Sequence, residues 1–154
     1  MDYLILKTLH ILSATVLLGT GAGSAFFMFV ANRRGDVDDI RAATRHVVLA
    51  DWVFTTPAII VQLATGLALM WVAGYGFDDG WIAAALALYL LAGACWVPVV
   101  WLQIRMRNMA EAAVDADAPL PDAYWRMERW WTALGAIAFP AVVLIVVLMV
   151  FKPF

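Results

Sequence analysis

The chain has 154 residues, of which 65% are hydrophobic and only 14% are charged, and its formal net charge is −2. A soluble globular domain is roughly half apolar and about one quarter charged, so this composition excludes an ordinary soluble protein. Ten basic residues stand against twelve acidic ones, which gives no electrostatic support for nucleic-acid binding.

Four long apolar stretches follow one another along the chain and predict four helices, at 3–31, 44–74, 81–108 and 123–151. Apolar stretches of about 18 or more residues are long enough to span a bilayer, and in lipid a helix satisfies its own backbone hydrogen bonds. The sequence therefore predicts an all-α, polytopic membrane protein. Its four-helix transmembrane bundle forms one domain over residues 1–154, with the lipid bilayer as its surroundings.

The arginines indicate how this bundle is oriented. All eight lie in two segments, four after the first predicted helix and four after the third. Loops rich in arginine and lysine remain in the cytoplasm. Both arginine-bearing loops are therefore expected inside, with both termini on the outer side.

The first predicted helix carries a lysine and a histidine one turn apart, Lys7 and His10, in the stretch LKTLHILSATVLLGTGAG. His10 lies roughly 10 Å below the outer surface at 1.5 Å per residue, and an ionisable group at that depth is a functional hypothesis by default. Haem b is one explanation. His10 would supply the axial nitrogen to iron, Gly19 and Gly23 would let the macrocycle approach the backbone, and Lys7 would meet the propionates.

Simpler interpretations stay open for each of these residues. His10 would then be a structural histidine bonded to a neighbouring helix, and Lys7 would extend its amine to the outer headgroups. Gly19 and Gly23 form a GxxxG pair, which is typical of close helix packing in membranes.

The second histidine cannot complete the coordination of the same iron. His46 falls at the inner start of the second helix, about 20 Å from His10 across a 30 Å core. A haem at His10 would therefore be five-coordinate, take Met70 or Met149 as its sixth ligand, or be shared by paired His10 residues in a homodimer. Both methionines would serve equally well as core filler, and a solvated interfacial role is preferred for His46.

Asp51 is an acidic residue about one turn inside the predicted inner surface. Three arginines are expected at the same depth in the membrane as Asp51, namely Arg45, Arg105 and Arg129. Their position favours a salt bridge to Asp51 within an inner-face polar network. A proton relay or a quinone-headgroup site is the alternative interpretation of Asp51.

Three stretches of the chain resemble a family of predicted four-helix bacterial integral membrane proteins whose function is not established: LKTLHILSATVLLGTGAG, ADWVFTTPAIIVQLATGLALM and LAGACWVPVVWLQIRMR. The first helix is more distantly similar to that of the haem-binding bacterial protoporphyrinogen oxidase and of the copper-resistance D membrane family. In the oxidase the first-helix histidine binds haem, and it matches His10. The pattern PRLF…H of the oxidase is replaced here by FFMFVANRRGD. The resemblance thus implies haem binding at His10, and the missing pattern argues against porphyrinogen oxidation. Together with the arginine distribution, the resemblance leads us to expect a bacterial inner-membrane protein with its termini in the periplasm.

Two hypotheses follow for function. In the first, the protein binds haem b and acts in electron transfer or an oxidoreductase reaction, with a redox partner or a quinone. In the second, it is a non-enzymatic membrane component, either transporter-like or a structural subunit, and holds no cofactor. Whether the chain is an enzyme is left open.

Overall fold

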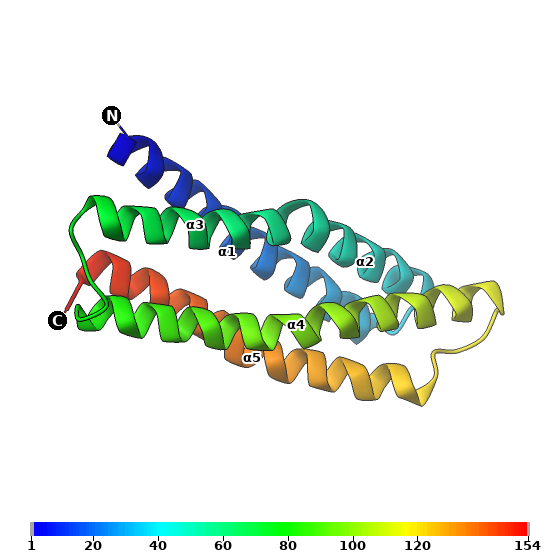
Figure 1. Ribbon diagram of the computed structural model, residues 1–154. Coiled ribbons are helices and arrows are strands. Elements are labelled where there is room, and N and C mark those ends of the chain that lie inside the picture. The colour runs from blue at the N-terminus through cyan, green and yellow to red at the C-terminus, as the bar shows by residue number, and fades with distance from the viewer. Residues whose placement is uncertain (1, 154) are drawn as a thin grey trace.

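The computed structural model describes residues 2–153, which fold into a bundle of long helices (Figure 1). In chain order these are α1 (Asp2–Arg34), α2 (Val37–Ala50), the π-helical segment η1 (Asp51–Thr55), α3 (Thr56–Val72), α4 (Gly80–Asp115) and α5 (Asp122–Phe151). Because α2, η1 and α3 are continuous, the described residues contain four segments long and apolar enough to cross a membrane. The predicted all-α architecture with four spans is confirmed.

The two termini lie at one end of the bundle, beside the turn between α3 and α4 (Figure 1). We call this the terminal end. The opposite end carries the connections 35–36 and 116–121, and we call it the arginine end because the arginines gather there. The buried core also lies toward the arginine end, where α4 packs against α5 and α2 packs against α4. Its largest fully buried members are Met28, Ile40, Val47, Met106 and Tyr124.

The second span begins at Val37 rather than at the predicted residue 44, because the sequence before it forms a complete helix cap. The backbone N–H of Asp39 donates to Asp36 Oδ1 at 2.9 Å. Asp38 and Asp39 in the first turn add negative charge at the positive end of the helix dipole. Gly35 ends the preceding helix with φ of +76°, a left-handed conformation that glycine adopts without a Cβ clash.

The third span also extends past its predicted end at 108, and α4 continues to Asp115. The added turns contain mostly strong helix formers, in the sequence MAEAAV. They bury Ala110 and Ala113 and place Glu111 Oε1 3.2 Å from Arg45 Nε of α2. The arginine end is therefore longer and better packed than the sequence predicted.

A π-helical turn, η1, separates α2 from α3 at the point where Pro57 follows. Proline has no amide hydrogen, so the helical ladder loses a bond here, and a wider turn is one way to accommodate that loss. Both the backbone N–H and the hydroxyl of Thr56 donate to the carbonyl of Asp51, the hydroxyl at 2.8 Å. Beyond this turn α3 packs mainly on α1. It also contacts α4 through a hydrogen bond of 2.8 Å, in which Tyr89 Oη of α4 donates to the Ile59 carbonyl of α3.

A lysine near the C-terminus closes the terminal end of the bundle. Lys152 Nζ donates to Tyr75 Oη at 3.1 Å and lies 5.2 Å from the ring centroid of Trp81. The bond joins the end of α5 to the turn between α3 and α4, and aromatic rings attract a cation in this position.

Replacement of Tyr124 by Phe tests the packing of the arginine end. Tyr124 is fully buried and its hydroxyl donates to Asn32 Oδ1 at 2.7 Å, so Tyr124→Phe leaves a buried acceptor without a partner. We expect the free energy of unfolding, measured by titration with a denaturing detergent, to fall by about 1–3 kcal/mol. Tyr3→Phe, at a residue 41% exposed, is the control and should change little. Equal stability of the two variants would contradict the assigned bond.

Candidate functional site

His10 lies between α1 and α3, and both of its ring nitrogens are hydrogen-bonded to side chains of α3. Nδ1 is 2.9 Å from Thr65 Oγ1, and Nε2 is 3.0 Å from Gln62 Nε2. Ser13, one turn along α1, donates its hydroxyl to Gln62 Oε1. Ser13 and Thr65 are each only 6% exposed. We call these four residues the His10 network.

The orientation of the Gln62 amide in the structure assigns the hydrogen of the neutral His10 ring to one nitrogen. An amide nitrogen can only donate, so Gln62 Nε2 donates and His10 Nε2 accepts through its lone pair. The single hydrogen of a neutral ring is then on Nδ1 and is donated to Thr65 Oγ1. The Thr65 oxygen can accept this hydrogen because the hydroxyl donates its own hydrogen to the Val61 carbonyl at 2.6 Å. The unprotonated Nε2 of His10 therefore has the Gln62 amide as its hydrogen-bond donor.

A glycine makes this close approach of α1 and α3 possible. A Cβ added to Gly66 would lie 3.2 Å from His10 Cε1 and 3.7 Å from Nδ1, which is tighter than ordinary van der Waals contact for the first pair. Thr65 and Gly66 are two residues of this site that were not predicted from the sequence. The signal available was the spacing of Gln62, Thr65 and Gly66 at i, i+3 and i+4, which places two polar residues and a glycine on one face of an apolar helix.

The other residues expected around His10 are placed differently. Lys7 is exposed, with Nζ 5.8 Å from the ring centroid of Tyr3. Met149 is 37% exposed on α5, and Met70 is half-buried on α3. The contacts of the His10 ring described above include neither methionine, so a sixth ligand from Met70 or Met149 stays a prediction.

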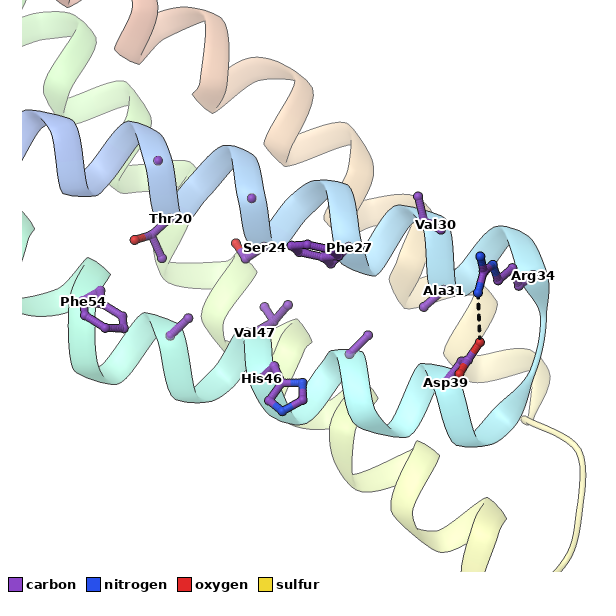
Figure 2. A pocket seen from close by; sticks show the side chains of 14 residues that line it. Thr20, Ser24, Phe27, Val30, Ala31, Arg34, Asp39, His46, Val47 and Phe54 are labelled. Carbon is purple, nitrogen blue, oxygen red and sulfur yellow. Dashed lines mark ion pairs between the residues drawn. The ribbon is translucent and has the colours of Figure 1, made fainter.

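Gly19 and Gly23 line a separate groove of about 630 Å³ between α1 and α2 (Figure 2). A Cβ on either glycine would meet nothing within 4 Å, so the expectation that this pair provides close packing within the chain was wrong. His46 lies at the edge of the same groove and is exposed. Arg34 and Asp39 form an ion pair of 3.7 Å at the groove's outer limit near the arginine end. The network around His10 and this groove are therefore distinct.

Asp51 is buried, but its partner is an amide rather than an arginine. Gln103 is oriented to satisfy both of its neighbours. Its amide N–H donates to Asp51 Oδ2 at 2.5 Å, and its amide oxygen accepts from Trp131 Nε1 at 3.2 Å. Arg45 is engaged by Glu111, about two turns outside the level of Asp51. The predicted salt bridge to Asp51 was wrong, because the extension of α4 supplies a nearer and more exposed carboxylate.

The remaining arginines of the expected network also point elsewhere. The guanidinium of Arg105 lies 5.4 Å from the ring centroid of Trp101, and Arg129 is exposed. Among residues 2–153 no ion pair involves Asp51. The same residues contain no group of three or more histidine, cysteine or acidic side chains that could hold a metal ion by themselves. A haem requires less of the protein, since it brings four nitrogen ligands of its own.

These features define the protein as a polytopic α-helical membrane protein with a polar network inside its spans. Residues 4–153 match a family described as a predicted integral membrane protein (DUF2269), and the chain belongs to that family. No curated protein and no solved structure matches the chain.

Replacement of Gly66 by Ala tests the contact between α1 and α3. In an ordinary helical position, Gly→Ala stabilises by up to about 1 kcal/mol, and we expect this gain for Gly93→Ala, whose added Cβ meets nothing within 4 Å. Gly66→Ala should instead lose about 1–3 kcal/mol relative to Gly93→Ala, because the new methyl group pushes on a ring held by two hydrogen bonds. Unfolding free energies in detergent provide the measurement. Equal gains in both variants would show that His10 does not lie on Gly66.

Proposed function

We propose that the protein binds haem b through His10 Nε2 and acts in membrane electron transfer or an oxidoreductase reaction. The arginine end faces the cytoplasm of a bacterial inner membrane in this proposal, and His10 lies in the outer half of the bilayer. Bound haem would supply the redox-active iron, and the chain supplies the axial nitrogen and its orientation.

The observation that carries this proposal is the pair of hydrogen bonds to the His10 ring, which assign its hydrogen to Nδ1 when the Gln62 amide is oriented as in the structure. Its Nδ1–H is donated to Thr65, so the lone pair is on Nε2. A neutral imidazole binds a metal through its unprotonated nitrogen. Ligating histidines in proteins commonly donate their other N–H to a fixed oxygen, which sets the ring orientation and raises its basicity. Thr65 would have this role here, and its own bond to the Val61 carbonyl fixes the hydroxyl.

Gln62 is the residue that would have to move. Its amide occupies the position on Nε2 that iron would take, and Ser13 holds the amide there. A change of the Gln62 rotamer would expose Nε2 without disturbing the bond from His10 to Thr65. Lys7, one turn closer to the terminal end, is the proposed propionate partner. Gly19, the nearer of the two groove glycines Gly19 and Gly23, lies nine residues beyond His10, roughly 14 Å along the helix. Neither glycine would therefore flank this iron.

A second candidate is favoured by the same bonds. Because Gln62 and Thr65 already satisfy both nitrogens, His10 can serve in a haem-free protein as the polar contact that holds α1 on α3. The protein would then be a non-enzymatic membrane component, either transporter-like or a structural subunit. The two candidates differ in what happens when Gln62 is removed.

The test is the absorption spectrum of protein purified from haem-replete cells, oxidised and then reduced with dithionite. We expect a Soret band that is lost in His10→Ala and retained in His46→Ala. Gln62→Leu should keep or increase the haem content, because it uncovers Nε2. A folded, colourless wild-type protein would favour the second candidate. Loss of the band in His46→Ala alone would place the haem in the groove between α1 and α2 and overturn the assignment to His10.

A further inference from the structure

Asp51 is a carboxyl group inside a membrane-spanning segment and is only 6% exposed. It belongs to η1, and it contacts Gln103 of α4, which in turn contacts Trp131 of α5. Gln103 and Trp131 are 5% and 7% exposed, so the whole chain of contacts is closed to bulk water. The proposed function at His10 makes no use of this cluster.

The direction of each bond in the cluster is fixed by Trp131. An indole N–H can only donate, so it requires the oxygen of the Gln103 amide, and the amide nitrogen must then face Asp51. A bound metal cation would require the opposite orientation, with the amide oxygen toward the carboxylate. The Gln103 amide is therefore oriented to donate a hydrogen bond to Asp51, and the cluster does not resemble a cation site.

No positive charge compensates Asp51 from any of the elements around it. On α2, Arg45 is paired with Glu111 and His46 is exposed toward the groove. On α4, Arg105 lies over the ring of Trp101. The nearest charged residues of α5 are Glu128, bonded to Thr132, and the exposed Arg129. The described part of α1 has no charged residue between Lys7 and Arg33.

An ionised carboxylate in this position would be a buried charge whose only hydrogen-bond donors among residues 2–153, the Gln103 amide and the Thr55 hydroxyl, are neutral. The penalty for such a charge is several kcal/mol, and proteins avoid it by keeping the group neutral. When Asp51 is protonated, its O–H is a further hydrogen-bond donor that needs an acceptor. Thr55, one turn along η1, is 7% exposed, and its hydroxyl lies near Asp51 and bonds no other described residue.

We propose that Asp51 is an intramembrane proton-binding site, protonated at rest, which exchanges its proton with the aqueous phase at the arginine end. Uptake converts the carboxylate and a hydronium ion into the carboxylic acid and water, with no change of oxidation state. Asp51 lies six residues from Arg45, roughly 9 Å along the helix, so the path to that surface is short. The proposal does not depend on haem binding at His10.

Infrared spectroscopy of the purified full-length protein, in a detergent without ester groups, tests this directly. The C=O stretch of a protonated carboxyl lies above the amide I band, where ionised acids do not absorb. We expect this band at neutral pH in the wild type and its loss in Asp51→Asn, which keeps the size of the side chain. The control Glu111→Gln, at the exposed partner of Arg45, should keep the band. Gln103→Leu should shift it to higher frequency, because the bond to Asp51 Oδ2 is removed.

Exchange of the proton is tested in the same sample. The band should shift in D2O, decline as the pH is raised and return when the pH is lowered. A wild-type protein without the band, or a band that persists in Asp51→Asn, would overturn the proposal. A band that neither shifts in D2O nor responds to alkaline pH would also overturn it, since the carboxyl would then be neutral but sealed. The wild-type measurements decide the question even if a variant fails to fold.

Discussion

Inside a bilayer a histidine ring has no water to bond, so its nitrogens depend on partners that the protein provides, and His10 has both of them on α3. Interhelical hydrogen bonds of this kind contribute only about 0.6 kcal/mol on average, so their main effect is on geometry. They fix how α1 lies on α3, they require a glycine at 66, and they leave the lone pair of His10 on Nε2. The proposed chemistry depends on that lone pair.

The two ends of the bundle are stabilised in different ways. The arginine end has a conventional core of buried apolar side chains, extended by the long α4 and by the ion pair of Arg45 with Glu111. Toward the terminal end, α1 and α3 are held by the His10 network, and Lys152 joins α5 to the turn before α4. Asp51 lies at the π-helical turn between these regions, where Pro57 interrupts the regular ladder. His10 and Asp51 are thus placed by helix contacts rather than by loops.

Composition and the lengths of the apolar runs were sufficient to predict four spans, because membrane thickness and backbone hydrogen bonding leave few alternatives. His10 and Asp51 were identified from their cost in such surroundings. Thr65 was not, since it is an ordinary polar residue until the helix register brings it to the ring of His10. The arginine partners expected for Asp51 came from matching levels along the membrane normal. Level alone does not determine which face of a helix a side chain occupies.

The form of the His10 ring is the most direct test of this account, and ¹⁵N NMR of histidine-labelled protein in lipid measures it. His46 supplies an internal comparison, since its exposed ring should show the averaged shifts of a solvated histidine. For His10 in the haem-free protein we predict a protonated Nδ1 and an unprotonated Nε2 that accepts a hydrogen bond from Gln62. A hydrogen on Nε2 with a bare Nδ1 would reverse every bond in the network and remove the nitrogen on which the proposed function relies.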